Sequence, residues 1–334
     1  MKEFEIRPAA LFNDFLEVAR KDIAVFFSDV DRFVDLGCPA CGSDGSVFSF
    51  KKHDMSYREC SDCGSLFMSP RPTQAMIDDY YRRSDSSKFW AERFFPETAE
   101  ARRELIFRPR AELLKSITER FSVPEPRVFS DIGAGIGLFL DEVKDLGFFE
   151  EIVAVEPSSE LAKVCREKGY AVVESTLEDT AESDFKVSVA SSFEVIEHLF
   201  QPVEFLRSAK SILKPGGLFI FTTLTCSGWD IQNLWKESKS VSPPHHINLI
   251  TTEGLEKIVQ HAGLELVELT TPGKLDVDIA VNMLDETPDL ELERFATYLL
   301  RKRGPECHAA FQKFLQDHRL SSHALVVARV PEAG

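Results

Sequence analysis

The chain has 334 residues, of which 43% are hydrophobic, and its formal net charge is −16. That length accommodates one large domain or two ordinary ones. The charge argues against nucleic acid as a partner, since such binding relies on Lys and Arg, although Arg102, Arg103, Arg108 and Arg110 could form a local basic patch. We find no apolar run of about 18 residues and no signal peptide, and we expect a cytoplasmic protein without a membrane span.

Residues 1–36 carry apolar side chains at three- and four-residue intervals, among them Leu11 and Phe15. This spacing predicts an N-terminal helix that packs on the rest of the protein. Alternatively, Phe26, Phe27 and Phe33 could face a partner subunit.

Two Cys-x-x-Cys-Gly segments follow within residues 37–68, at Cys38–Gly42 and Cys60–Gly64. Their spacing fits a tetrahedral zinc site, and Val47–Tyr57 between them predicts a hairpin, so the segment is interpreted as a zinc ribbon. The predicted zinc ligands are Cys38, Cys41, Cys60 and Cys63. Four thiolates leave no position for water, which indicates a structural metal. Two disulfides or an iron–sulfur site are the alternatives.

Residues 69–126 predict a helical linker. The prolines of Ser69–Pro72 exclude helix, and Thr73 is suited to cap the helix that follows. Two further helices are predicted over Glu97–Arg108 and Arg110–Phe121.

A glycine-rich turn at Gly133–Gly137 interrupts the apolar stretch Val128–Leu140. Glycine allows a ligand to approach the backbone, and the following helix offers free N–H groups to an anionic or electron-rich group. The pattern is G-x-G-x-G, not the dinucleotide pattern G-x-G-x-x-G. A second strand, Ile152–Val155, ends in Glu156, whose two carboxylate oxygens can accept both hydroxyls of a ribose.

These residues resemble the class I S-adenosylmethionine-dependent methyltransferases. DIGAGIG resembles their first motif and VAVEP their second, and the likeness continues through Val187–Leu199, Leu213–Gly217 and Pro243–Thr251. Alternating strands and helices over 127–334 predict an α/β fold, a mostly parallel sheet with helices on both faces. The resemblance implies the family's seven-stranded Rossmann-like sheet with an antiparallel last pair. It also implies that helices of 69–126 form a lid, for which Tyr80, Tyr81, Phe89 and Trp90 are candidate inner-face residues.

The resemblance implies S-adenosylmethionine as the cofactor. Glu156 would hold the ribose, the glycine turn and Asp131 the methionine end, and Thr176 and Leu177 the adenine. The predicted cofactor residues are Asp131, Gly133, Ala134, Gly135, Gly137, Glu156, Pro157, Thr176, Leu177, Ser192, Phe193 and Glu194.

If a helix begins after the fourth strand, Glu194, Glu197 and His198 fall on one face of it, and His246 could complete a metal-binding set. This spacing resembles the metal-assisted O-methyltransferases of ubiquinone biosynthesis and of small-RNA 3′ ends, in which a divalent cation activates the acceptor. Otherwise His246 or His198 would be the general base. The predicted catalytic residues are therefore His246, His198 and Glu197, with His245 a weaker choice than its neighbour.

Two later segments leave alternatives open. Thr225–Ser242 carries Trp229 and Trp235, which predict either an acceptor pocket or core packing. Residues 274–320 predict a helical insertion whose use is a pocket wall or an oligomer contact.

We therefore predict a methyltransferase with an N-terminal zinc ribbon. The acceptor would be a small molecule such as a sugar, a lipid-linked intermediate or a natural-product precursor, with oxygen favoured over carbon or nitrogen. The alternatives are metal-assisted RNA 2′-O-methylation and a non-catalytic zinc-ribbon interaction module on a methyltransferase-like fold. The sequence fixes neither the acceptor nor the oligomeric state.

Overall fold

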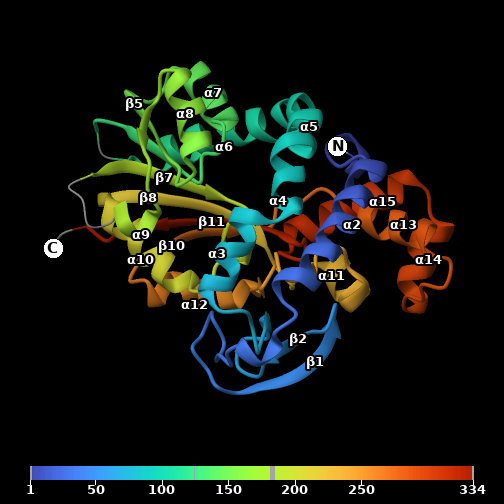
Figure 1. Cartoon of the computed structure of the whole chain (residues 1–334). Coiled ribbons are helices and arrows are strands. Elements are labelled where there is room, and N and C mark those ends of the chain that lie inside the picture. Colours follow the sequence, from blue (N-terminus) through green and yellow to red (C-terminus); the bar gives the residue numbers. More distant parts are fainter. Residues whose placement is uncertain (1, 124, 181–184, 333–334) are drawn as a thin grey trace. The chain divides into compact units, whose positions relative to one another are not determined.

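The computed structural model describes residues 2–332 except 124 and 181–184 (Figure 1). Residues 1, 124, 181–184, 333 and 334 lie outside the described part. The chain divides into two compact units, each built from three segments. The first comprises Met1–Glu100, Leu224–Gly254 and Thr270–Ala324, and the second comprises Ala101–Thr223, Leu255–Leu269 and Leu325–Gly334. The domain limits expected from the sequence follow the chain in order and stay predictions.

The second unit is built on a seven-stranded sheet with the order β10-β11-β8-β7-β4-β5-β6. The strands are β4 (Val128–Ile132), β5 (Glu151–Val155), β6 (Ala171–Val173), β7 (Val187–Phe193), β8 (Leu213–Leu224), β10 (Glu265–Thr270) and β11 (His323–Arg329). The pairs β4–β5, β4–β7, β5–β6 and β7–β8 are parallel. The predicted fold class is confirmed, and the carboxyl ends of the central strands meet at one edge.

Strand β11 runs against this direction. The Thr225 amide after β8 donates to the Ser322 carbonyl before β11 at 2.8 Å, and the Gly216 amide near the start of β8 donates to the Val330 carbonyl at 3.0 Å. The end of one strand thus lies beside the beginning of the other. This antiparallel arrangement confirms the last pair that the resemblance implies.

Helices cover both faces of this sheet (Figure 1). One face carries α6 (Arg108–Arg120), α7 (Leu138–Asp145) and α8 (Ser159–Glu167), and the other carries α9 (Leu177–Thr180) and α10 (Pro202–Ile212). The core under the first face includes Phe129, Phe139, Leu140, Val189 and Ile220. The glycine turn therefore sits between a buried strand and a helix that packs on it.

The predicted interruption between Glu97–Arg108 and Arg110–Phe121 is wrong. Instead α5 (Phe95–Arg102) continues through a π-helical turn, η3 (Arg103–Phe107), into α6. Pro109 lies in the first turn of α6, where a missing N–H costs little.

The first unit contains a four-stranded sheet with the order β1-β2-β3-β9. The strands are β1 (Ser46–Lys52), β2 (Met55–Cys60), β3 (Leu66–Met68) and β9 (Asn248–Leu249), and all pairs are antiparallel. His53 and Asp54, both with positive φ, form the predicted hairpin turn between β1 and β2. Strand β9 was not predicted, because its partner lies about 180 residues earlier in the sequence.

The N-terminal helix is confirmed as α2 (Ala9–Phe26), preceded by α1 (Glu3–Ile6) and followed by η1 (Val30–Arg32). Its apolar face packs against α3 (Gln74–Arg83), α4 (Asp85–Phe89) and the π-helical η2 (Trp90–Phe94). Phe12 and Phe15 contact Phe94, and the rings of Phe26 and Phe27 lie 5.6 and 5.2 Å from that of Tyr80. These rings are therefore used inside the unit, as are Phe89 and Trp90, which pack against the same cluster.

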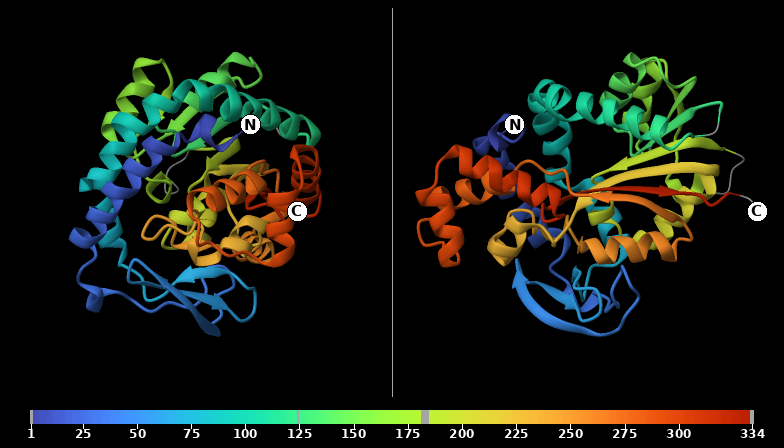
Figure 2. Two further views of the ribbon diagram at one scale, coloured as in Figure 1. Left: turned by 90° about the vertical axis from the view of Figure 1, so that its right-hand side faces the viewer. Right: turned by 180° about the vertical axis from the view of Figure 1, so that it is seen from behind.

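Further helices of the first unit gather around a separate core (Figure 2). They are α11 (Trp229–Leu234), α13 (Asp276–Glu286), α14 (Arg294–Lys302) and α15 (Pro305–Asp317). The short η5 (Trp235–Glu237) instead contacts β1 through the rings of Trp235 and Phe50, 5.7 Å apart. Helix α12 (Thr252–His261) has residues assigned to both units. Trp229 packs edge-on against Phe311, with ring centroids 5.1 Å apart. The sequence left an acceptor pocket and core packing open for Trp229, and in the structure Trp229 packs against this core. None of the helices in the described ranges has the length and apolar character needed to cross a membrane.

Candidate functional site

The turn between β4 and α7 presents backbone to an open space. Gly133, Gly135 and Gly137 have φ values of 79°, 58° and 73°, a region that other residues rarely adopt. The Gly133 and Ala134 amides both donate to the Val155 carbonyl, at 2.9 and 3.3 Å, which fastens the turn to β5. A Cβ placed at Gly135 would meet no atom within 4 Å. The turn is thus rigidly held and has room for a ligand beside its backbone.

Glu156 lies against this turn at the end of β5. Its side chain is only 6% exposed, and its two oxygens accept from the Gly135 amide at 2.8 Å and the Ser158 amide at 2.9 Å. Burial raises the pKa of the carboxyl, while these two N–H groups oppose the rise. A carboxylate oxygen has two lone pairs, so each oxygen can accept one more hydrogen bond. The geometry suits a pair of hydroxyls.

Asp131, at the end of β4, accepts a hydrogen bond from the Ser191 hydroxyl at 2.6 Å. Burial raises the pKa of Asp131 to about 7, against the opposing effects of Ser191 and Arg110. The carboxyl therefore titrates near neutral pH and would ionise fully beside a cation. Ser191 was not predicted as a site residue, although it directly precedes the predicted Ser192.

Arg110 is a second site residue that the sequence reasoning did not identify. Its guanidinium donates to Glu194 at 3.3 Å and lies 4.4 Å above the Phe193 ring. Burial lowers its pKa, opposed by Glu194 and Asp131. The signal was present in the sequence: Arg110 stands one helical turn before Leu114, on the face of α6 that also carries the buried Ala111.

Two other arginines of the candidate basic patch form ion pairs with a buried glutamate. Arg103 and Arg108 both form ion pairs with Glu142, whose side chain is 3% exposed. These two guanidinium groups are thus matched by a buried carboxylate within the unit.

The helix that would place Glu194, Glu197 and His198 on one face does not form. Only a single 3₁₀ turn, η4 (Ile196–His198), forms, and Glu194 precedes it with a left-handed φ of 56°. The Glu194 carboxylate accepts from the Thr222 hydroxyl at 2.6 Å, which holds this uncommon conformation. Backbone strain of this kind tends to occur at functional sites.

Glu197 is 1% exposed and accepts a hydrogen bond from the Thr223 hydroxyl at 2.7 Å. Burial, and then the charge of Glu194, raise the pKa of Glu197 to about 8. Arg110 and the Thr223 hydroxyl oppose this rise, and without a bound metal ion the balance favours the protonated carboxyl. Glu194, Glu197 and His198 belong to the second unit and His246 to the first, so their joint action as metal ligands stays a prediction.

Other predicted cofactor residues surround the same strand ends. The Ser192 hydroxyl is buried and has no hydrogen-bond partner among the described residues, which leaves it available to a ligand. Leu177 is buried, whereas Pro157 is exposed. The exposed Thr176 uses its hydroxyl to accept from the Asp179 amide at 3.2 Å, as a cap of α9. An adenine contact by Thr176 stays a prediction.

In the first unit, two adjacent histidines have different surroundings. His246 Nδ1 lies 2.6 Å from the Ser240 carbonyl, which can only accept, so Nδ1 carries a proton, and in the neutral imidazole Nε2 carries the lone pair. His245 Nε2 lies 2.8 Å from the Tyr80 hydroxyl, and its ring packs on Phe15. The tautomer of His246 suits a base or a metal ligand.

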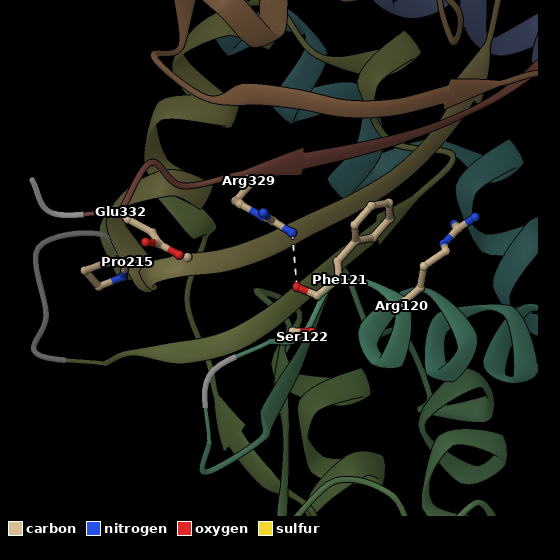
Figure 3. A pocket seen from close by; sticks show the side chains of 7 residues that line it. Arg120, Phe121, Ser122, Pro215, Arg329 and Glu332 are labelled. Carbon is tan, nitrogen blue, oxygen red and sulfur yellow. Dashed lines mark hydrogen bonds between the residues drawn. The ribbon is translucent and has the colours of Figure 1, made fainter.

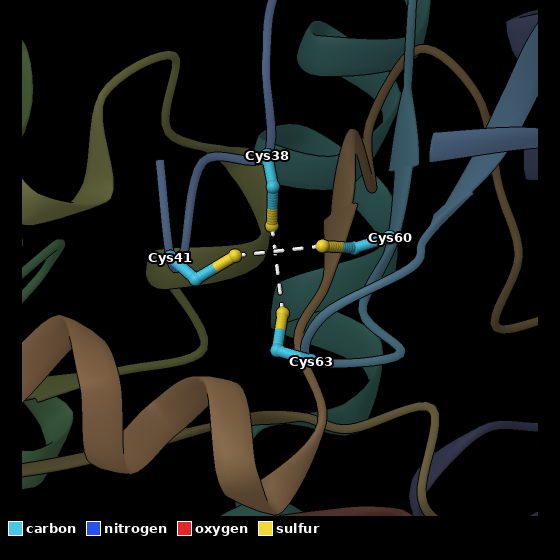
Figure 4. Close-up of side chains that lie close together, drawn as sticks. All are labelled: Cys38, Cys41, Cys60 and Cys63. Carbon is cyan, nitrogen blue, oxygen red and sulfur yellow. Dashed lines mark hydrogen bonds between the residues drawn. The ribbon is translucent and has the colours of Figure 1, made fainter. Parts of the chain in front are cut away.

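The four predicted zinc ligands converge in the first unit (Figure 4). The sulfur atoms of Cys38, Cys41, Cys60 and Cys63 lie within 4.8 Å of one another, and none forms a disulfide. Zn–S bonds of about 2.3 Å in a tetrahedron would place sulfurs about 3.8 Å apart. Gly42 and Gly64 have positive φ and close the two turns, because their N–H groups donate hydrogen bonds to the Cys38 and Cys60 carbonyls, both at 2.9 Å. This arrangement fits a zinc ion.

The ribbon also supports the segment that carries His246. Tyr57, which is fully buried in β2, donates its hydroxyl to the His246 carbonyl at 2.7 Å. The Thr251 hydroxyl donates to the Cys63 carbonyl at 2.6 Å, and β3 pairs with β9 between these two contacts. The zinc-ligand segment and the His246 loop are therefore parts of one hydrogen-bonded structure.

The sequence is similar to those of known methyltransferases. A family model described as "Methyltransferase domain" matches residues 101–269, about half of the chain. The chain is 29% identical over 149 residues to a ubiquinone biosynthesis O-methyltransferase of Ruegeria pomeroyi, covering 38% of this chain and 59% of that protein. It is 28% identical over 170 residues to the enzyme of that name from Xanthomonas euvesicatoria, covering 47% and 70%.

Solved structures of methyltransferases are also similar. One, from Archaeoglobus fulgidus, is 19% identical with a TM-score of 0.42, covering 66% of this chain and 94% of that one. The plantazolicin methyltransferase BpumL is 11% identical with a TM-score of 0.49, covering 77% and 94%.

Proposed function

Because the chain belongs to the methyltransferase-domain family, we propose that it transfers the methyl group of S-adenosylmethionine to an oxygen atom of a small molecule. The observation that carries this proposal is Glu156, held by the amide of Gly135 at the open glycine turn. The names of the curated relatives favour oxygen as the acceptor atom. The acceptor class we propose is a sugar, a lipid-linked intermediate or a natural-product precursor.

The cofactor would lie along the ends of β4, β5 and β7. Glu156 would accept the two ribose hydroxyls, and the buried Leu177 would line the adenine position. Asp131 would bind the ammonium and Arg110 the carboxylate of the methionine end, since opposite charges close together match a zwitterion. The whole set comprises Asp131, Gly133, Ala134, Gly135, Gly137, Glu156, Pro157, Thr176, Leu177, Ser192, Phe193 and Glu194, with Arg110 added.

S-adenosylmethionine supplies an electrophilic methyl group on a sulfonium, and the chain must orient the acceptor and remove its proton. We assign proton removal to His246, because its Nδ1 proton is committed to the Ser240 carbonyl and Nε2 can accept another. Glu197 and His198 would assist from the second unit. Alternatively, a divalent cation at Glu194, Glu197, His198 and His246 would lower the pKa of the acceptor hydroxyl. Cation binding would require Glu197 to lose the proton that burial favours.

The zinc ion would be structural. Cys38, Cys41, Cys60 and Cys63 fill a tetrahedral shell and leave no position for substrate or water. Unpaired thiols throughout the chain fit a reducing compartment, and we propose a cytoplasmic location.

The test combines labelled S-adenosylmethionine with a small-metabolite extract and, separately, with total RNA. We expect the label in a low-mass product, attached to oxygen by NMR, and none in RNA. His246→Ala should abolish transfer and still bind S-adenosylhomocysteine. Label in RNA would establish the RNA alternative, and absence of S-adenosylhomocysteine binding by the wild type would favour a non-catalytic module.

Chelation distinguishes proton removal by His246 alone from proton removal assisted by a divalent cation. If a divalent cation assists, activity falls after mild chelation that leaves the ribbon zinc in place, and Mg²⁺ or Mn²⁺ restores it. Full activity after chelation and in Glu197→Ala would rule out metal assistance.

A further inference from the structure

A cavity of about 480 Å³ opens in the second unit, away from the residues of the proposed cofactor site (Figure 3). The end of α6, the start of β8 and the end of β11 form it. The residues that line it include Arg120, Phe121, Ser122, Pro215, Arg329 and Glu332. Cavities of this size accommodate metabolites.

This cavity lies at the opposite end of the sheet from the cofactor residues. Gly216 lines it near the start of β8, whereas Thr222 of the same strand contacts Glu194. Six residues of strand span about 20 Å. The cavity is therefore separate from the proposed methyl-transfer site.

Arg329 lacks the partners that a partly buried guanidinium usually has. Its Nη2 donates to the Phe121 carbonyl at 3.1 Å, but no carboxylate of the described residues pairs with it. Its Nε is buried without an acceptor in the part of the chain described. Buried donors are nearly always satisfied by protein, water or a bound ion. Arg120, in contrast, forms an ion pair with Glu268 at 2.7 Å.

The surroundings hold the guanidinium in place. The Phe121 ring lies 5.6 Å from the Arg329 guanidinium carbon and 4.8 Å from that of Arg120. Figure 3 shows Arg329 between Phe121 on one side and Pro215 and Glu332 on the other. A planar guanidinium fixed in this way matches the oxygens of a carboxylate or phosphate.

We infer that this cavity is a binding site for a small oxyanion, the carboxylate or phosphate group of a metabolite, with Arg329 as its main contact. The competing explanation is that Arg329 only caps the carbonyl end of α6, where positive charge is favourable. Capping predicts a loss of stability in variants of Arg329 and no link between anion concentration and that stability.

The experiment titrates full-length protein with inorganic phosphate and, separately, with acetate, at constant ionic strength adjusted with chloride. Binding is followed by calorimetry and by the thermal midpoint. We expect saturable binding in the millimolar range, reduced about tenfold in Arg329→Met and about threefold in Arg329→Lys, which keeps the charge and loses the fork. Tighter binding of phosphate than acetate would identify a phosphate group as the ligand feature, and the reverse a carboxylate.

Glu332→Gln is the matched test, because its exposed side chain carries the opposing charge and its loss does not threaten folding. We expect it to tighten anion binding about twofold. Retained S-adenosylhomocysteine binding by Arg329→Met shows that the variant is folded. Equal affinities in wild type and Arg329→Met, or no saturation by either anion, would overturn the inference in favour of capping alone.

Discussion

The glycine turn and the His246 loop are built from very different stretches of sequence. Around the turn, Glu156 is fixed by amides 21 and 2 residues away. The His246 loop is fixed by Tyr57, 189 residues away, and by Cys63, which lies 188 residues from Thr251. The first is a short-range structure within a βαβ unit, and the second depends on strand pairing between distant segments.

This difference would separate the cofactor binding that we propose for the turn from the proton removal that we propose for His246. The turn needs only β4, β5 and their connecting helix, whereas the His246 loop needs an intact ribbon. Damage to the ribbon should therefore impair methyl transfer and leave cofactor affinity nearly unchanged. Substitutions in the turn should abolish both.

Glu156→Ala should have the largest effect. Two charge-assisted hydrogen bonds of about 1.5–3 kcal/mol each would be lost, so we expect S-adenosylhomocysteine affinity to fall at least 100-fold. Calorimetric titration measures it, with Glu167→Ala, an exposed glutamate of α8, as control. An affinity within threefold of the wild type would show that the ribose is held elsewhere.

Cys60→Ser tests the ribbon. We expect zinc content to fall and methyl transfer to drop about 100-fold, since displacement of a reacting group by about 1 Å can cost that much. S-adenosylhomocysteine affinity should change less than threefold. Cys307→Ser, outside the cluster, should retain zinc and activity. If affinity and transfer fell together, the two regions would not be independent.

Arg110→Met tests the proposed contact between Arg110 and the methionine carboxylate of the cofactor. Loss of the guanidinium removes the proposed partner of the methionine carboxylate, and we expect S-adenosylhomocysteine affinity to fall about 30-fold, with Arg110→Lys intermediate. Arg207→Met, which removes an exposed arginine of α10, is the control. An unchanged affinity in Arg110→Met would confine Arg110 to neutralising Glu194.

Tyr57→Phe tests the contact between the ribbon and the His246 loop, because it removes only the hydroxyl group. Removal of the hydroxyl takes this donor from the partly buried His246 carbonyl, at a cost of about 1 kcal/mol in unfolding free energy. We expect kcat to fall about tenfold, with zinc content and KM for S-adenosylmethionine unchanged. Tyr298→Phe is the control, since Tyr298 is 53% exposed. An unchanged kcat would mean that the loop holds His246 without Tyr57.

The same difference between short-range and long-range structure decides which features could be predicted from the sequence. The turn, Glu156, the sheet and the ribbon hairpin could be predicted, because each depends on local patterning or on the spacing of a motif. Strand β9 and the Tyr57–His246 contact could not, since nothing local marks a pairing across the chain. The helix considered at Glu194 does not form, because tertiary hydrogen bonds from Thr222 and Arg110 outweigh its helical spacing. Arg110 could have been found as a cation on the apolar face of α6.

The smallest expected effect is on the pH dependence of cofactor binding, and it is confined to the turn side. The pKa of Asp131 is about 7, above its ordinary value of 3.8, so folded protein without ligand keeps a proton that the unfolded chain releases. Unfolding free energy therefore falls as pH rises from about 4 to 7. A ligand ammonium requires the ionised form, so S-adenosylhomocysteine affinity should fall about threefold between pH 7.5 and 6.5.

Calorimetry at the two pH values, in buffers of different ionisation enthalpy, would detect the proton released on binding. Asp131→Asn cannot release that proton, so its affinity should be weaker at pH 7.5 and independent of pH over this range. Ribbon variants such as Tyr57→Phe should keep the wild-type pH dependence, because Asp131 lies in the other unit. If Asp131→Asn retained the pH dependence, another group would bind the ammonium, and the proposed role of Asp131 would be wrong.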